Sequence, residues 1–129
     1  MKIFGIGTDI INIKRINNSI KRGGLNFKKK IFSDREIKYC EKKKNPSAFY
    51  AKRFAAKEAF SKALGTGISK GISFNEIIVK NIKSGKPLIK LSGKTKIVVH
   101  KMLKKKKFNT FLSLSDDKLS AIATVVISL

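Results

Sequence analysis

The sequence predicts an α+β fold, in which a small antiparallel sheet packs against a long central helix and several shorter helices. Helical patterns dominate the first half of the chain, and patterns typical of strands dominate the second half. Between them, residues 53–65 combine many alanines with long straight side chains and contain no β-branched residue. Because these residue types favour the helix strongly, this stretch is expected to form the central helix.

Length and composition predict one globular domain spanning residues 1–129, since 42% of the residues are hydrophobic. No apolar run approaches the roughly 18–20 residues of a membrane span. Asp9 comes too early for the apolar core of a signal peptide, and the single cysteine, Cys40, fits a reducing compartment as a semi-buried filler. A cytoplasmic protein is expected.

The chain should begin with a strand over residues 2–8, in which Gly5 and Gly7 allow another backbone or a ligand to come close. Asp9 follows this strand, where a carboxylate could cap the next helix or bind a metal. Residues 12–22 predict an amphipathic helix with a narrow stripe of isoleucines, ended by Gly23-Gly24. The opposite face of this helix is basic and carries Lys14, Arg15, Lys21 and Arg22.

Local signals also define the next two helices. Ser33 and Glu36 form a capping-box pattern for a helix that runs to about residue 43. Asn45 and Pro46 are suited to the N-cap and first position of the central helix, and Gly65 to its left-handed end. A flexible loop is expected over residues 65–71.

The central helix carries charges on more than one side. Glu58 and Lys62 lie one turn apart among small side chains, which predicts either an ordinary i,i+4 ion pair or a ligand site. Arg53 and Lys57 fall among the large apolar residues, so no side of the helix is wholly polar. We therefore expect packed neighbours on most sides of this helix.

The second half predicts a hairpin, a helix and a closing pair of strands. Strands over residues 72–81 and 87–91 flank a connection at residues 84–86. Residues 94–107 have helical spacing with a lysine face, and His100 lies there without a nearby acid or nucleophile. Residues 110–115 and 121–129 are expected to pair antiparallel.

The formal charge of +22 predicts polyanionic partners, and a small nucleic-acid-binding module is one interpretation. Yet 26 of the 30 basic residues are lysine, and neither arginines for base readout nor stacked aromatics are concentrated. That interpretation predicts a steeply salt-dependent affinity for nucleic acid that does not respond to substitution of Asp9 or Glu58.

Two motifs carry a resemblance to a known family. Gly5-Ile6-Gly7-Thr8-Asp9-Ile10, with the stretch from Arg53 to Gly67 about fifty residues on, resembles the holo-[acyl-carrier-protein] synthases. These enzymes are the short bacterial-type branch of the 4′-phosphopantetheinyl transferases. Shorter matches at Phe32-Ser33-x-x-Glu36, Gly71-Ile72-Ser73-Phe74, Gly85-Lys86-Pro87 and Ser113-Leu114-Ser115 extend the resemblance over nearly the whole chain.

The resemblance implies transfer of 4′-phosphopantetheine from coenzyme A to a serine of apo-acyl carrier protein, with release of 3′,5′-ADP, for fatty acid biosynthesis. It implies that Asp9 and Glu58 hold Mg²⁺ against the pyrophosphate, a use of carboxylates that this hard ion favours. Glu58, or a metal-bound water that it orients, would be the base, and Lys62 would stabilise the phosphates. The implied coenzyme-binding residues are Arg53, Lys57, Lys62, Gly65 and Ser115; for Arg53 and Lys57 a role in the fold remains the alternative.

The resemblance further implies a homotrimer with active sites between subunits. The carrier protein is acidic, and Lys14, Arg15, Lys21 and Arg22 are the residues expected to dock it. One departure concerns Asp116, where family members usually have a histidine near the coenzyme. A carboxylate there would repel phosphate unless Lys118 offsets its charge or the side chain turns away.

Overall fold

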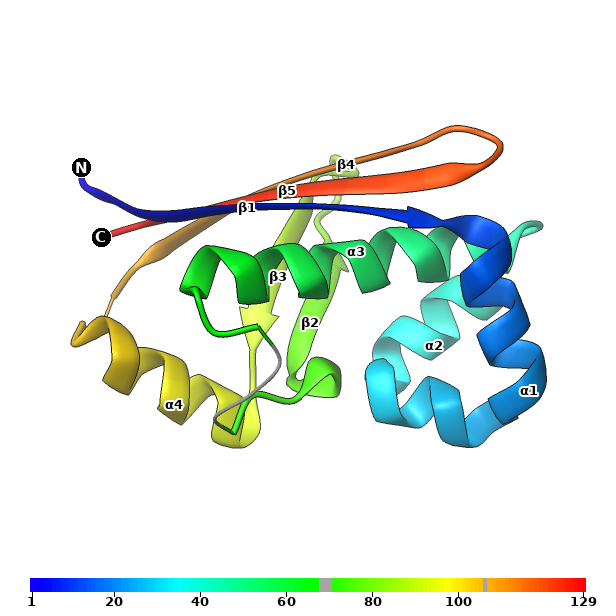
Figure 1. The fold of residues 1–129 in the computed structure, drawn as a ribbon, viewed down its shortest axis with the longest axis horizontal. Coiled ribbons are helices and arrows are strands. Elements are labelled where there is room, and N and C mark those ends of the chain that lie inside the picture. The colour runs from blue at the N-terminus through cyan, green and yellow to red at the C-terminus, as the bar shows by residue number, and fades with distance from the viewer. Residues whose placement is uncertain (68–70, 106) are drawn as a thin grey trace.

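The computed structural model describes residues 1–67, 71–105 and 107–129. Its main sheet has three antiparallel strands in the order β1 (Ile3–Asn12), β5 (Ser120–Ser128) and β4 (Asn109–Asp116). The helix α3 (Pro46–Leu64) lies along one face of this sheet (Figure 1). The predicted α+β architecture with a long central helix is confirmed, and so is the antiparallel pairing of the last two strands.

The other helices lie near the two ends of α3, and a hairpin crosses α3 and reaches the main sheet (Figure 1). α1 (Ile13–Ile31) and α2 (Asp34–Glu41) lie at one end, and α4 (Gly93–Leu103) at the other. A 3₁₀ turn, η1 (Phe74–Glu76), leads into the hairpin of β2 (Ile77–Asn81) and β3 (Pro87–Leu91). None of the helices described combines the length and hydrophobicity needed to cross a bilayer.

The two early glycines allow β1 to lie directly on the backbone of α3. A Cβ atom added at Gly5 would stand 1.9 Å from the carbonyl oxygen of Ala63, and one added at Gly7 would stand 1.8 Å from that of Ala59. No side chain fits in this contact, so the strand and the helix approach each other more closely than ordinary packing permits. Of the two alternatives, the glycines therefore serve the approach of another backbone.

α3 begins and ends where the sequence predicts. Pro46 occupies its first turn, and Gly65 ends it in the left-handed conformation with φ 83°. Asn45 takes the N-cap position, but its side chain makes no capping hydrogen bond. Most of the helix is buried, including Arg53 and Lys57, which confirms that it has packed neighbours on most sides.

Lys57 and Glu36 join four elements inside the core. The Lys57 ammonium donates to Glu36 Oε1 at 2.8 Å and to the carbonyl oxygens of Phe74 and Ile77. Glu36 completes the predicted capping box with Ser33, and its Oε2 also accepts from the amide of Val79 at 3.2 Å. Since both charged side chains are at most 1% exposed, their pairing compensates for the water that each has lost.

Several boundaries differ from the expectation. β1 continues to Asn12, so Asp9 lies inside the strand, and the side chain of Asn12 caps α1 by accepting from the Arg15 amide. Gly24 adopts φ 55° and ψ −141°, outside the helical region, and interrupts α1 where the sequence predicts a break; a second helical segment, which was not expected, follows and reaches Ile31. α2 ends at Glu41, two residues before the expected end.

The second half shows two further differences. β2 begins only at Ile77, because η1 occupies residues 74–76. α4 ends at Leu103, where the left-handed Lys104 stops it. Within the expected loop after α3, residues 68–70 lie outside those described. Cys40 is fully buried, and burial raises the pKa of its thiol to about 12, which keeps it an uncharged core residue.

Candidate active site

The structure brings Asp9, Glu58 and Lys62 together at the contact between β1 and α3. Asp9 follows Gly5 and Gly7 on the strand face that meets the helix. The Lys62 ammonium donates to Asp9 Oδ1 at 3.1 Å and to the carbonyl oxygen of Thr8 at 3.0 Å. The ion pair of Lys62 is thus made with Asp9, 53 residues away, instead of with Glu58 one turn back. The alternative that Asp9 caps the next helix is wrong, because the side chain of Asn12 caps α1.

Glu58 experiences two effects that disfavour its charged form. Partial burial raises the pKa of its carboxyl, and the negative charge of Asp9 raises it further, while Lys62 acts in the opposite direction. A carboxylate whose ionisation is disfavoured by a second carboxylate nearby makes a site that attracts a cation. Among the described residues there is no group of three or more acidic, cysteine or histidine side chains that could hold a metal. This pair is therefore the carboxylate site to consider for Mg²⁺.

Lys57 does not lie at this site, although it precedes Glu58 in sequence. Its ammonium is fully buried, and its three N–H donors all meet acceptors within the core. It therefore has neither exposure nor a free donor with which to contact coenzyme A. The expected coenzyme-binding role of Lys57 is corrected to a role in the fold, which was the alternative for this residue.

Arg53 lies in the wall of a cavity of about 280 Å³ between α3, the β2–β3 hairpin and β4. Its guanidinium stacks 4.2 Å from the Tyr39 ring centroid and donates to Asn81 Oδ1 at 2.7 Å. Because Arg53 is only 2% exposed, it contributes positive charge to the wall more than direct contact. Lys52 and the hairpin residues Gly85 and Pro87 line the same cavity.

Asp116 lies at the edge of this cavity and forms an ion pair with Lys52, Nζ to Oδ1 3.2 Å. The sequence suggested Lys118 as the residue that offsets the charge of Asp116. In the structure Lys52 of α3 forms that ion pair instead. Of the other expected coenzyme-binding residues, Gly65 has open space beside its Cα. Ser115 points from the exposed outer face of β4, opposite to the face that meets α3. Within one chain, Ser115 does not join Asp9 and Glu58.

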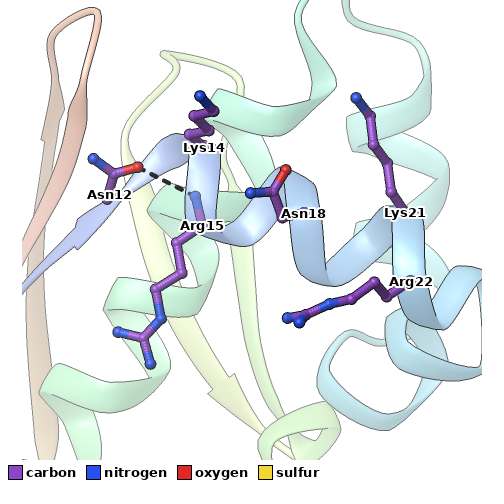
Figure 2. A pocket seen from close by; sticks show the side chains of 6 residues that line it. All are labelled: Asn12, Lys14, Arg15, Asn18, Lys21 and Arg22. Carbon is purple, nitrogen blue, oxygen red and sulfur yellow. Dashed lines mark hydrogen bonds between the residues drawn. The ribbon is translucent and has the colours of Figure 1, made fainter.

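The four basic residues expected to bind a partner do lie together. Figure 2 shows Lys14, Arg15, Lys21 and Arg22 around one cavity at the start of α1, which we call the basic groove. The cavity measures about 500 Å³, and Asn12 and Asn18 complete its lining. Helical spacing alone predicted this gathering, because residues 14, 15, 21 and 22 share one side of the helix.

Sequence reasoning missed three residues beside the Arg53 cavity: Tyr39, Lys52 and Asn81. Asn81 lies 28 positions from Arg53, and Asp116 lies 64 positions from Lys52. Contacts over such separations cannot be predicted from local sequence spacing. The only available signal was the run of hairpin residues before Pro87, which indicated a turn and not a cavity wall.

Comparison with known proteins identifies the family. Residues 5–122 match the family model of the 4′-phosphopantetheinyl transferase superfamily. A holo-[acyl-carrier-protein] synthase of Pelagibacter ubique is 48% identical over 127 residues, covering 98% of both chains. That of Vibrio vulnificus is 44% identical over 126 residues, again covering 98% of both.

Solved structures agree with these relatives. The holo-[acyl-carrier-protein] synthase of Neisseria meningitidis superposes with a TM-score of 0.86 at 36% identity, covering 98% of this chain and 99% of that one. The Bacillus anthracis enzyme, solved in complex with coenzyme A (3′,5′-ADP), has a TM-score of 0.80 at 36% identity and covers 99% and 98%. On its motifs, its fold and these relatives, the chain belongs to the holo-[acyl-carrier-protein] synthases of the 4′-phosphopantetheinyl transferase superfamily.

Proposed function

We propose that this protein transfers 4′-phosphopantetheine from coenzyme A to a serine of an apo-acyl carrier protein, in the cytoplasm and for fatty acid biosynthesis, through a single domain spanning residues 1–129. The observation that carries the proposal is the carboxylate pair of Asp9 and Glu58 beside the Lys62 ammonium. The serine oxygen would form a bond to the β-phosphorus, the bridging P–O bond would break, and 3′,5′-ADP would leave.

The residues present fit a magnesium ion. Asp9 and Glu58 provide hard oxygen ligands, and the pKa of Glu58 is already raised by its burial and by Asp9, an opposition that a cation relieves. When bound there, Mg²⁺ would neutralise negative charge on the pyrophosphate oxygens and favour departure of the nucleotide. Mg²⁺ typically takes one or two carboxylates from a protein that binds phosphates with it, and this site supplies two.

Glu58 and Lys62 have distinct roles in this proposal. The Glu58 carboxylate accepts the proton of the serine hydroxyl, directly or through a water. The Lys62 side chain is 51% exposed and therefore able to move from Asp9 to a phosphate oxygen. There its charge would stabilise the negative charge that develops during transfer.

The cavity beside Arg53 is suited to the nucleotide end of coenzyme A. Lys52, Arg53 and Lys43 bring positive charge to it, and Lys43 also lies 4.6 Å from the Tyr39 ring centroid. Lys52 and Glu58 are six positions apart on α3, a rise of about 9 Å along the helix and about 120° around it. An extended coenzyme would therefore have to pass partly around α3 to reach from this cavity to the carboxylates.

The basic groove on α1 is suited to an acidic carrier protein. Lys14, Arg15, Lys21 and Arg22 line it, and the sequence contains no acidic residue between Asp9 and Asp34. Opposite charges would steer the carrier to the groove and accelerate association. The large positive charge of the chain then has an assigned partner that is a protein and not a nucleic acid.

The outer face of the main sheet is suited to self-association. In register across the strands, Ile6, Val126 and Phe111 form one row, and Ile10, Ile122 and Ser115 form another. Ile6 and Ile10 are about two-thirds exposed, and no described helix covers this face (Figure 1). A homotrimer would bury such an apolar patch and could bring Ser115 of one subunit to the coenzyme of another.

Intact-protein mass spectrometry tests the reaction. Incubation of an apo-acyl carrier protein with this protein, coenzyme A and Mg²⁺ should add one phosphopantetheine, and omission of the metal should prevent it. Glu58→Ala should lower the rate by about 10²–10⁴-fold while the protein stays folded. Asp34→Asn, at an exposed carboxylate on α2, serves as the control and should leave the rate unchanged. Full activity of Glu58→Ala would refute the role of Glu58.

A further inference from the structure

The ion pair between Lys52 and Asp116 connects α3 to β4 at the edge of the cavity that Arg53 lines. The Lys52 side chain is 18% exposed and that of Asp116 is 33% exposed, so both remain within reach of a ligand. The Lys52 ammonium also lies 4.3 Å from the centroid of the Phe49 ring, which belongs to the cavity lining. Lys52 is therefore a cation of this cavity whose side chain a ligand can reach, and it is already paired with the Asp116 carboxylate.

Asp116 is the carboxylate that pairs with Lys52 of the cavity lining. The sequence from residue 77 to residue 115, which includes the hairpin wall and β4, contains no Asp or Glu. The neighbouring Asp117 is occupied by its own turn, because its Oδ1 accepts from the amides of Leu119 and Ser120. An anion that binds Lys52 in the cavity must therefore compete with the Asp116 carboxylate.

We propose that Asp116 sets the affinity of the cavity for the nucleotide end of coenzyme A, by competing with a phosphate of the ligand for the Lys52 ammonium. This inference rests on the proposed function, which places that end of the coenzyme in the Arg53 cavity. In the free protein Asp116 holds Lys52 across the cavity edge, and ligand binding exchanges one anion for another. Asp116 thus weakens the capture of coenzyme and speeds the release of 3′,5′-ADP.

The physical reason is that the lysine cannot satisfy both anions equally. An ammonium is a compact charge on a flexible stem, and each anion that it meets must give up part of its hydration. Phosphate binding therefore gains only the difference between the new contact and the Asp116 contact that it replaces. The Asp116 carboxylate also repels the incoming phosphate directly, an effect that does not require Lys52.

A double-mutant cycle separates these two effects, with 3′,5′-ADP as the probe and its Kd measured by calorimetry. Asp116→Asn should tighten binding about threefold to tenfold, which is about 0.7–1.4 kcal/mol at 1.4 kcal/mol per tenfold. Lys52→Met should weaken binding. In the Lys52→Met background, Asp116→Asn should retain only the smaller gain that comes from relief of direct repulsion. Raising the salt concentration should shrink every difference, because the groups are partly exposed.

Asp117→Asn is the matched control. It removes the same charge one residue further on, and the Asn side-chain oxygen can keep both turn hydrogen bonds, so the Kd should not change. An unchanged or weaker affinity of Asp116→Asn would overturn the inference, and so would an equal gain in both Lys52 backgrounds. If carrier modification proceeds normally in those cases, the proposed function stands and only the role of Asp116 falls. Absence of both transfer and 3′,5′-ADP binding would overturn the two together.

Discussion

Lys57 offers the sharpest test of how this fold is stabilised, because its ammonium is fully buried and bonded to three acceptors. In Lys57→Met, the Glu36 carboxylate would remain in the core without its counter-ion. Removing one partner of a buried ion pair typically costs about 3–5 kcal/mol. That loss would be a large fraction of the roughly 5–15 kcal/mol by which domains are stable.

Urea unfolding measures this loss. With a slope of about 2 kcal/mol per molar urea, the midpoint should fall by about 1.5–2.5 M. Lys52→Met is the matched control: it removes a lysine one and a half turns earlier on α3, from a partly exposed pair that contributes at most about 1 kcal/mol. Glu36→Gln combined with Lys57→Met should cost less than the sum of the single changes, since no unpaired charge remains.

The same variant separates a role in the fold from a role in coenzyme binding. Because Lys57 has no exposed atom to offer a ligand, Lys57→Met that is still folded should bind 3′,5′-ADP within about twofold of the unsubstituted protein. A loss of stability below about 1 kcal/mol, together with a tenfold loss of 3′,5′-ADP affinity, would refute the reasoning. Such a result would restore the coenzyme-binding role that the sequence allowed.

Three further predictions follow from the site and its supports. The folded protein raises the pKa of Glu58, so ionised Glu58 lowers the free energy of unfolding at any pH above that raised pKa. Without Mg²⁺, Glu58→Gln should therefore be more stable than the unsubstituted protein at neutral pH, by up to about 1 kcal/mol. This gain should fade as the pH falls through the raised pKa toward the ordinary value of 4.5, and thermal unfolding at a series of pH values measures it. Gly7→Ala should cost about 3 kcal/mol in urea unfolding, because its Cβ would meet the Ala59 carbonyl, whereas Thr8→Ala should cost far less; equal losses would contradict the close contact. Lys14→Glu with Lys21→Glu should slow carrier association about tenfold at low salt and less at high salt in stopped-flow measurements, while Lys101→Glu should not; a similar slowing by Lys101→Glu would point to net charge alone.

The ends of the helices could be predicted because their signals are local. The capping box of Ser33 and Glu36 and the left-handed Gly65 act within one turn of the chain, so the sequence contains the whole interaction. The basic groove on α1 was predictable for the same reason, since helical periodicity fixes which residues share a side. The break at Gly24 was predictable for the same reason, whereas the helical segment that follows it and reaches Ile31 was not predicted.

The sequence by itself determined the family and most of the helices, since these follow from motifs and short-range periodicity, and the family resemblance implied the carboxylate pair of Asp9 and Glu58. Only the tertiary structure decided which charges meet. Lys62 pairs with Asp9 across 53 residues, Lys57 with Glu36 across 21, and Lys52 with Asp116 across 64. The sequence does not distinguish a lysine that lies in the core from one that lies at a carboxylate site or at the edge of a cavity. Its role follows from burial and from the partner that the packed elements bring to it, and both exist only once the chain has folded.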